Sequence, residues 1–264
     1  MAFLNLPPKP PTRQIRALQS ESVDDDGTTQ RQTITVYQAY PSSIAIPAIT
    51  HQRLDASPDF RTTRMTWIKP SWAWMLYRSG YSYKDPGQER ILAIEMKRED
   101  FLGLLGRGIL THGTTATGGG GAAGEATSND AQGGARTSME ERDRKAAARE
   151  SKRKDRLQSL DVKIQWDPER TVRLDTLNYR SIQIGIPAGL IKEWAQSMIV
   201  SIEDVTDRAR ELKRILDERP DVTEEELAEL GLLPEETEVE VPIELRSRLG
   251  MSVNHHGLVS RTSV

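Results

Sequence analysis

The 264-residue chain contains no cysteine and only four histidines. The lack of cysteine excludes a disulfide scaffold, a cysteine-ligated zinc site and a cysteine nucleophile. No apolar run reaches the ~18 residues of a membrane-spanning helix, and the first residues lack the apolar core of a signal peptide. We therefore expect a cytoplasmic or nuclear protein with no membrane partner.

Familiar catalytic templates are also missing. The sequence contains no P-loop, no glycine-rich dinucleotide motif after a strand, and no G-x-S-x-G nucleophile elbow. The acidic run Asp24–Asp26 is not followed by spaced ligands, so no metal is expected. The net charge of −3 argues mildly against tight nonspecific binding to nucleic acid, although a local basic groove remains compatible with it.

Glycine and charge are unevenly distributed along the chain. Eleven of the nineteen glycines lie within residues 103–134, and residues 136–156 carry nine basic side chains but no Leu, Ile, Val or aromatic residue. Such segments bury too little apolar surface to offset the entropy of ordering them. We therefore predict a low-complexity, charged insertion over 111–157 that interrupts a single domain.

The remaining boundaries follow from the same composition. The prolines and acidic residues of 1–28 predict a disordered N-terminal segment, and 251–264 a flexible tail. The two blocks of the single domain are then 29–110 and 158–250.

Hydrophobic periodicity within the two blocks predicts both strands and helices. Alternating patterns predict strands over 33–40, 91–97, 162–166, 181–186 and 199–202. Helices are expected over 70–79, 207–218 and 223–230, the last with a Thr223–Glu226 capping box. Asp167–Arg170 is expected to form a turn. The elements lack a regular strand–helix alternation, which favours an α+β fold with a mixed, largely antiparallel sheet and flanking helices.

The most distinctive stretch, from Arg61 to Arg90, interleaves aromatic and basic side chains. Its candidate ligand-binding residues are Arg64, Trp67, Lys69, Ser71 and Arg78. Aromatic faces stack on bases and guanidinium groups bind phosphate, so the pattern suits a ligand that carries both. A helix that starts after Lys69-Pro70-Ser71 would also present N–H groups to an anion.

The same stretch has a purely structural interpretation. Trp72, Trp74, Met75 and Leu76 fit the buried face of a helix. Trp74 and Arg78 are four residues apart, so a cation–π contact within the helix would explain Arg78 without a ligand. Both interpretations stay open at this point.

Further polar candidates lie on the predicted strands and nearby. They are Tyr37, Gln38, Arg53, Tyr179, Arg180 and Gln183 as ligand-binding residues, and His51 and Glu89 as weak catalytic candidates. Tyr179, Ser181 and Gln183 form a polar row on an otherwise apolar strand, which indicates a polar cleft or an ordinary solvent-facing surface.

Several motifs resemble the family catalogued as domain of unknown function 4291. They are the segments 33–40 (TITVYQAY), 51–53 (HQR), 64–71 (RMTWIKPS), 75–80 (MLYRSG), 88–90 (QER), 165–170 (QWDPER) and 179–185 (YRSIQIG). The motifs occur in order across both blocks, over about 170 residues. The resemblance implies a shared domain and brings no established activity with it. The glycine-rich insertion departs from the compact form of the family.

Three hypotheses of function follow. The first is an enzyme acting on a nucleotide or a nucleic-acid end, such as an ADP-ribosyl transfer, with NAD or another nucleotide as candidate cofactor. The second is a non-catalytic module that binds RNA, or a protein partner at the acidic helices of 203–248, which carry a net charge of −9. The third places the function in the insertion. The sequence leaves enzyme status, substrate and oligomeric state undecided.

Overall fold

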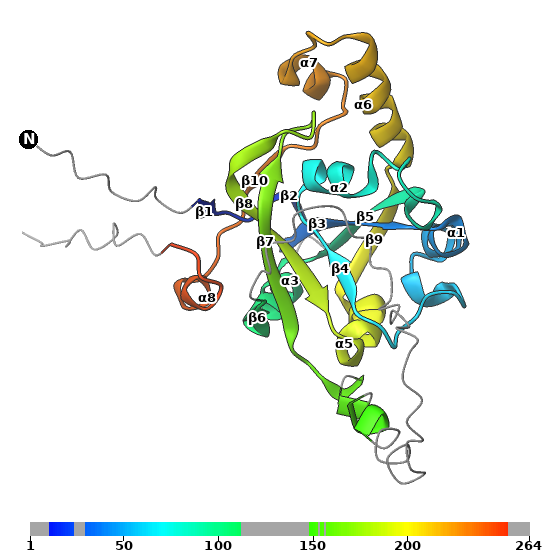
Figure 1. Ribbon diagram of the computed structural model, residues 1–264, viewed down its shortest axis with the longest axis vertical. Helices are drawn as coiled ribbons and strands as arrows, with labels where there is room; N and C mark the ends of the chain where they lie inside the picture. Colours follow the sequence, from blue (N-terminus) through cyan, green and yellow to red (C-terminus); the bar gives the residue numbers. More distant parts are fainter. Residues whose placement is uncertain (1–10, 24–29, 112–147, 153, 156, 253–264) are drawn as a thin grey trace, which may run out of the picture.

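The computed structural model describes residues 11–23, 30–111 and 148–252, with the exception of 153 and 156. It has an α+β fold with two five-stranded sheets (Figure 1). Most strand pairs are antiparallel, as the sequence predicts; β1–β8 and β6–β7 are parallel. No helix in the described part of the chain is long and apolar enough to cross a membrane.

We call the first sheet the central sheet. Its strands are, in order, β10 (Glu236–Glu238), β2 (Arg16–Val23), β3 (Gln30–Tyr40), β5 (Arg90–Lys97) and β9 (Ile199–Asp204). The second, or outer, sheet contains β1 (Thr12–Arg13), β8 (Thr176–Ile186), β7 (Val162–Arg170) and β6 (Gly108–Leu110), with β4 (Thr66–Ile68) also paired to β8.

Helices surround the two sheets. They are α1 (Ser42–His51), α2 (Trp72–Ser79), α3 (Arg98–Gly106), α5 (Ala188–Glu193), α6 (Thr206–Glu218), α7 (Glu224–Glu229) and α8 (Ile243–Arg248). Short 3-10 turns cover Leu54–Ala56 and Pro86–Gln88, and a π-helical turn covers Trp194–Met198. Figure 1 shows α6 and α7 at one end of the molecule and α8 to one side.

The central sheet is buried on both faces because its strands alternate in the way that the sequence predicts. Ile34 and Val36 of β3 face a core that both sheets share with α1, α3 and α5. Tyr37 and Ala39 face the opposite way, into a second core under α2 and α6. The apolar stripe of α6, which includes Leu212, closes this second core.

The outer sheet has one apolar and one polar face. Ile164, Ile182 and Ile184 are fully or almost fully buried in the shared core. On the opposite face, Gln165 of β7 lies directly across from Gln183 of β8. The edge of β8 that faces away from β7 pairs with two short strands. β1 pairs with residues 179–180 and β4 with residues 184–186.

The two sheets meet at a backbone bridge just after β4. The N–H of Tyr37 donates to the carbonyl of Lys69 over 2.6 Å, and the N–H of Lys69 donates to the carbonyl of Tyr37 over 3.1 Å. β4 therefore belongs to the outer sheet by its pairing with β8, while the residue that follows it is attached to the central sheet.

Three predictions need correction. The disordered segment expected over 1–28 is wrong for residues 12–13 and 16–23, which form β1 and β2. Asp167–Arg170 continues β7 with a shift of register, and the chain turns at 171–175 instead, where Leu174 has a φ of 72°. Met251, assigned to the flexible tail over 251–264, is buried, and residues 253–264 lie outside the described residues.

The predicted insertion over 111–157 is described only in part. Residues 112–147 lie outside the described residues, and 148–152 are helical.

Gly185 of β8 provides a test of how the polar face is packed. A Cβ atom at this position would lie 2.9 Å from the sulfur of Met65 and 3.0 Å from the ring of Trp67. We expect Gly185→Ala to push the Trp67 ring off the strand and to lower the free energy of unfolding by about 1–3 kcal/mol, measured by urea denaturation.

Gly103→Ala is the matched control. Gly103 is exposed in α3, and a Cβ there meets nothing within 4 Å. This substitution should stabilise the protein slightly, by about 0.5–1 kcal/mol, because alanine favours helix. Equal effects of the two substitutions would contradict the close packing of Trp67 on Gly185.

Candidate functional site

The site is organised by the start of α2. Ser71 is its N-cap, and its Oγ accepts a hydrogen bond from the N–H of Trp74 over 3.1 Å. The helix ends at Gly80, whose positive φ of 57° suits glycine. These boundaries confirm the helix predicted over 70–79. The expected burial of Trp72, Trp74, Met75 and Leu76 is confirmed as well.

Lys69 is the most unusual residue of this region. Its side chain is only 3% exposed, and its Nζ lies 4.9 Å from the centroid of the Trp74 ring. Across the described ranges, Nζ has no hydrogen bond and no ion pair, and it keeps a small contact with solvent. Burial, with the positive charge of Arg78 as a second cause, lowers the pKa of Lys69 to about 7, and Asp167 opposes this shift. A substantial fraction of this amine is therefore neutral near pH 7.

Polar side chains of the outer sheet lie beside Lys69. Asp167 accepts hydrogen bonds from the amide groups of Gln165, over 2.9 Å, and Gln183. The β4–β8 ladder ends where Ile68 pairs with Ile184, and Lys69, the next residue, lies close enough to Asp167 for the carboxylate charge to act on its amine. These neighbours leave an amine, an amide row and a carboxylate on one face.

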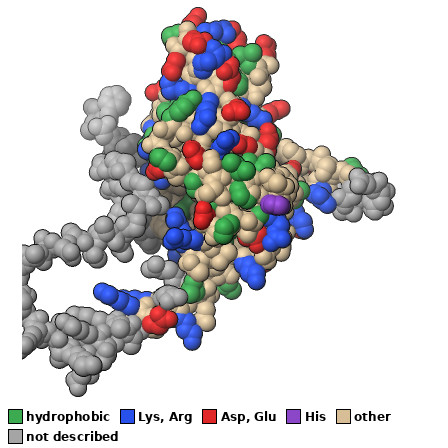
Figure 2. Space-filling view, turned by 90° about the vertical axis from the view of Figure 1, so that its right-hand side faces the viewer, with side chains coloured by type: hydrophobic (Ala, Val, Ile, Leu, Met, Phe, Trp, Pro, Cys, Tyr) green, Lys and Arg blue, Asp and Glu red, His purple; other side chains and the backbone are tan. Residues whose placement is uncertain are grey.

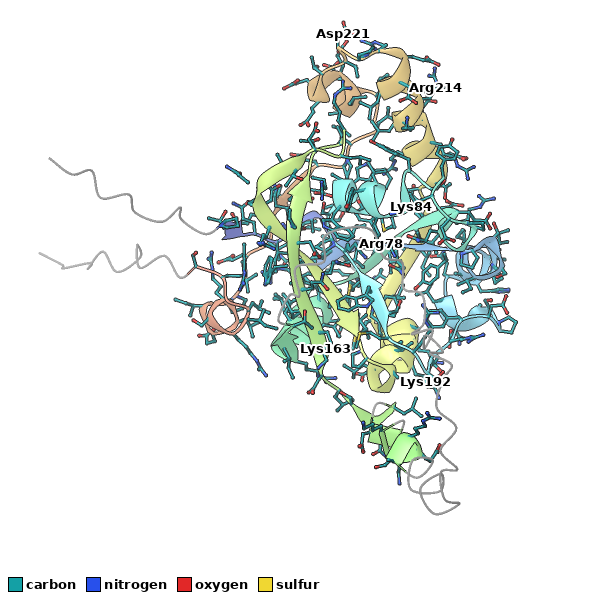
Figure 3. The ribbon with its side chains drawn as sticks, in the orientation of Figure 1. Arg78, Lys84, Lys163, Lys192, Arg214 and Asp221 are labelled. Carbon is teal, nitrogen blue, oxygen red and sulfur yellow. The ribbon has the colours of Figure 1, made fainter. Side chains whose placement is uncertain are left out.

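Arg78 of α2 completes this face with a second cation. Its side chain is half-buried, and within the described part of the chain it makes no hydrogen bond or ion pair. In Figure 3, Arg78 lies near the middle of the view where α2 meets β4, and Lys163 lies lower on β7. Lys163 and Trp67 both pair with Gly185, and the ring of Trp67 packs over that glycine.

Two carboxyl groups, the buried Glu169 and the half-buried Glu236, occupy the other side of the helix start. Glu236 Oε1 accepts from the N–H of Trp72 over 2.6 Å, and Glu169 Oε1 accepts from Ser71 Oγ over 3.0 Å. Burial raises the pKa of Glu236 to about 8 and also raises that of Glu169. The N–H groups of Trp72 and Trp74 are therefore bound within the protein, and the helix terminus does not offer them to an anion.

The structure brings together five of the predicted ligand-binding residues. They are Trp67, Lys69, Ser71, Arg78 and Gln183. The cation over Trp74 is Lys69 rather than Arg78, and a different arginine, Arg170, lies 4.0 Å above the ring of Tyr77. The intrahelical cation–π explanation of Arg78 therefore has no support.

Three further predicted residues border the site. The ring of Tyr37 packs on Trp72 with centroids 5.2 Å apart, and burial raises its pKa. The pKa of Tyr179 is raised by burial and by the charge of Glu169. Arg180 donates to the carbonyl of Trp166 over 2.8 Å, so its guanidinium supports the hairpin.

The other predicted residues lie elsewhere. His51 is exposed at the end of α1, and Arg53 is ion-paired with Asp55 over 3.0 Å. Gln38 is half-buried on the face of β3 opposite Tyr37, and Arg64 is exposed before β4. Within the described part of the chain, none of these four makes a hydrogen bond, ion pair or ring contact with Lys69.

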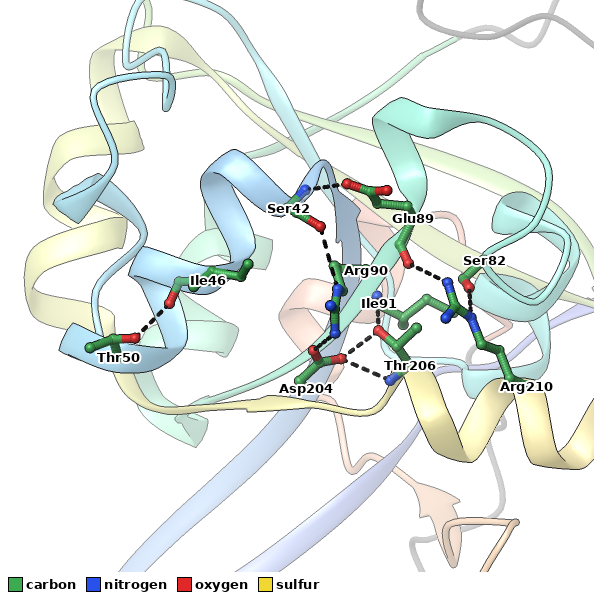
Figure 4. A network of polar contacts seen from close by, with 10 residues as sticks. All are labelled: Ser42, Ile46, Thr50, Ser82, Glu89, Arg90, Ile91, Asp204, Thr206 and Arg210. Atoms are coloured by element: carbon green, nitrogen blue, oxygen red, sulfur yellow. Dashed lines mark hydrogen bonds and ion pairs between the residues drawn. The ribbon is translucent and has the colours of Figure 1, made fainter.

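Glu89 has a structural role at the start of α1 (Figure 4). Its carboxylate accepts from the N–H of Ser42 over 2.7 Å, and this bond lowers its pKa. The adjacent Arg90 pairs with Asp204 over 3.0 Å. A carboxylate held ionised at a helix start is poorly suited to act as a general acid or base near neutral pH.

Sequence reasoning missed several residues of the site. Asp167 and Glu169 were assigned to a turn, and Glu236 to an acidic surface. Gln165 alternates with buried residues of β7, so the sequence alone indicates that it lies on the polar face of the strand. The position of Glu236 is not indicated by the sequence, because it contacts Trp72 across 164 residues of chain.

A separate hollow of about 340 Å³ lies over β2, β3 and β10. It is lined by Gln19, Ser20, Glu21, Gln32, Thr33, Arg98, Glu238 and Glu240. It contains none of the predicted site residues and no aromatic side chain, so we place the candidate site at Lys69. Across the described ranges, no group of three or more Asp, Glu or His side chains is placed to hold a metal ion.

The acidic helices α6 and α7 carry charges that are paired within the protein. Lys213 pairs with Asp217, Arg214 with Glu211 and Glu218, and Arg219 with Glu226. Figure 2 shows acidic and basic side chains intermixed at this end of the molecule. A protein partner at these helices stays a prediction without added support from the charge distribution.

Comparison with known proteins assigns the chain to a family. The family described as domain of unknown function (DUF4291) matches residues 26–239, so the chain belongs to it, as its motifs indicate. No curated protein and no solved structure gives a match. The matched region includes α2, Lys69 and both glutamates.

The buried amine predicts a pH-dependent stability difference. Because the folded state lowers the pKa of Lys69, the unfolded chain binds more protons above pH 7, and this group makes stability rise toward pH 10.5. We expect Lys69→Met to be more stable than the wild type at pH 6, on the order of 3 kcal/mol, with the difference shrinking by pH 10. Urea denaturation of both proteins at each pH measures it.

Lys192→Met is the control, because Lys192 is exposed on α5. It should change the free energy of unfolding by less than about 0.5 kcal/mol throughout this pH range. A Lys69→Met protein that gives the same small, pH-independent difference would show that the amine is solvated.

Proposed function

We propose that this protein is an enzyme that acts on a nucleotide or a nucleic-acid end, at the face formed by α2 and the polar side of the outer sheet. The observation that carries the proposal is the amine of Lys69, which is buried, has no polar partner and stands beside a second unpaired cation, Arg78. Burying an unpaired amine costs stability, so its presence suggests a functional use.

Each part of a nucleotide has a matching group on this face. Arg78 makes no hydrogen bond or ion pair within the described part of the chain, so its donors are free for phosphate oxygens. Lys163 is a second cation on the same face. The half-buried ring of Trp67, which packs over Gly185, provides a surface for a base.

Lys69 and Asp167 are suited to chemistry rather than to phosphate binding. A lysine that is partly neutral near pH 7 acts as a nucleophile or as a base. Asp167 is held in place by two amide donors and is the acidic group that acts on Lys69. An ADP-ribosyl transfer, in which a nucleotide-linked ribose carbon is attacked, is one reaction that these groups would serve.

Binding of ADP provides the test. We expect ADP to raise the Tm of the full-length protein, and adenosine to raise it far less, because the phosphates supply most of the contact energy. Arg78→Met should weaken ADP binding roughly 10–100-fold, as expected for the loss of a charge-assisted hydrogen bond. Titration calorimetry with ADP, NAD, ATP, GTP and short RNAs measures the affinities.

Lys192→Met again provides the matched control, since it removes one positive charge from an exposed helix. It should leave ADP binding unchanged. The proposal fails if none of these ligands binds at millimolar concentration, or if Arg78→Met and Lys192→Met weaken binding equally. Binding without turnover of any nucleotide would favour the non-catalytic module.

A further inference from the structure

The surroundings of Lys69 distinguish between a phosphate anchor and a reacting amine. An anchor lysine keeps its ammonium group in water or paired with acidic groups. Lys69 fits this arrangement poorly: it is 3% exposed, its Nζ faces the Trp74 ring and makes no ion pair, and the acid that acts on it, Asp167, also accepts hydrogen bonds from two amides. Of the two charges that act on Lys69, the positive charge of Arg78 has the larger effect on its pKa. Desolvation together with a neighbouring cation is the arrangement that activates lysine as a nucleophile.

We propose that the Nζ of Lys69 forms an imine with the open-chain aldehyde of a ribose attached to a nucleoside diphosphate, that is, a nucleotide sugar with a free anomeric carbon. This inference rests on the proposed function, because Arg78 and Lys163 hold the diphosphate while Lys69 meets the sugar. It specifies the substrate class and the bond that the site makes.

The step balances without a further reagent. The lone pair of the neutral Nζ attacks the aldehyde carbon, and the carbonyl oxygen takes up one of the two protons of the amine to give a carbinolamine. The hydroxyl group of the carbinolamine then leaves as water when it receives a proton that the nitrogen has released. One C–N double bond forms, one C–O double bond is lost, and no oxidant or reductant is consumed.

The contacts of Lys69 suit the imine product as well as the free amine. An imine nitrogen is readily protonated, and the resulting cation lies where the Trp74 ring already faces Nζ at 4.9 Å. Asp167 supplies a carboxylate for this cation. A sugar must displace the groups that cover Lys69, and Arg78 can move without breaking a hydrogen bond or an ion pair within the described structure.

Trapping with a reducing agent tests the inference. The full-length protein is incubated with ADP-ribose and sodium cyanoborohydride at pH 7, and the modified peptides are identified by mass spectrometry. We expect Lys69 to be modified at least about tenfold faster than the exposed Lys84 and Lys192, because more of its amine is neutral. Excess ADP should suppress the modification, and Lys69→Met should abolish it at this position.

Parallel ADP titration keeps the two proposals apart. If ADP binds in an Arg78-dependent manner but Lys69 is modified no faster than Lys192, the imine inference is overturned and the proposed function survives. If ADP does not bind and Lys69 reacts equally well with propanal, the amine is reactive but the nucleotide-sugar assignment is wrong. Modification of Lys69→Arg at the same total rate as the wild type would also overturn the inference, and circular dichroism would confirm that this variant folds.

Discussion

The Tyr37–Lys69 backbone bridge is the constraint on which the candidate site depends. Its two hydrogen bonds join the central sheet to the segment that leaves the outer sheet after β4. Backbone pairing fixes the position of Lys69, and the direction of its side chain follows from the alternation along that segment. Pro70 and Ser71 then start α2 immediately, so Trp74 and Arg78 are placed one and two turns along the helix that covers the same amine. Lys69 is thus held by three elements: β3, β4 and α2.

Burial makes the ionised forms of side chains energetically unfavourable where the two sheets meet. Lys69 and Glu169 are each 3% exposed, and burial shifts the pKa of both groups, and of Glu236, toward their neutral forms. The glutamates are compensated, because Glu169 accepts from Ser71 and Glu236 accepts from Trp72. They serve the local structure by satisfying the start of α2. Lys69 has no hydrogen bond or ion pair, and only the Trp74 ring and the charge of Asp167 favour its cation, which separates it from the two glutamates and makes it the stronger functional candidate.

The sequence was most informative where local patterns match the final fold. The alternation of β3, β5 and β8, the stripe of α6 and the Thr223–Glu226 capping box were all readable because each is set by neighbouring residues. The short strands β1, β4 and β10 were not, since each has two or three residues and exists through a partner distant in sequence. β2 was missed because RALQSESV has little apolar alternation, although strands pair with it on both sides. The site divides in the same way: Trp67, Lys69 and Arg78 lie in one distinctive stretch, whereas Asp167 and Glu236 reach it only through tertiary folding.

Membership of an uncharacterised family defines the domain, and fold alone does not determine chemistry, so any function must be argued from the site. The aromatic and basic residues that first suggest a nucleotide are in part ordinary packing, as the burial of Trp72 and Trp74 shows. Packing accounts for the tryptophans but not for two neighbouring cations, Lys69 and Arg78, that lack polar partners in the described structure. A protein that needed only a stable core would be more stable with an apolar residue in place of Lys69, because the Trp74 ring and Asp167 offset only part of the cost of burying its amine. The uncompensated cost is the physical reason for assigning the chemistry to this residue rather than to His51 or Glu89, whose surroundings impose no comparable cost.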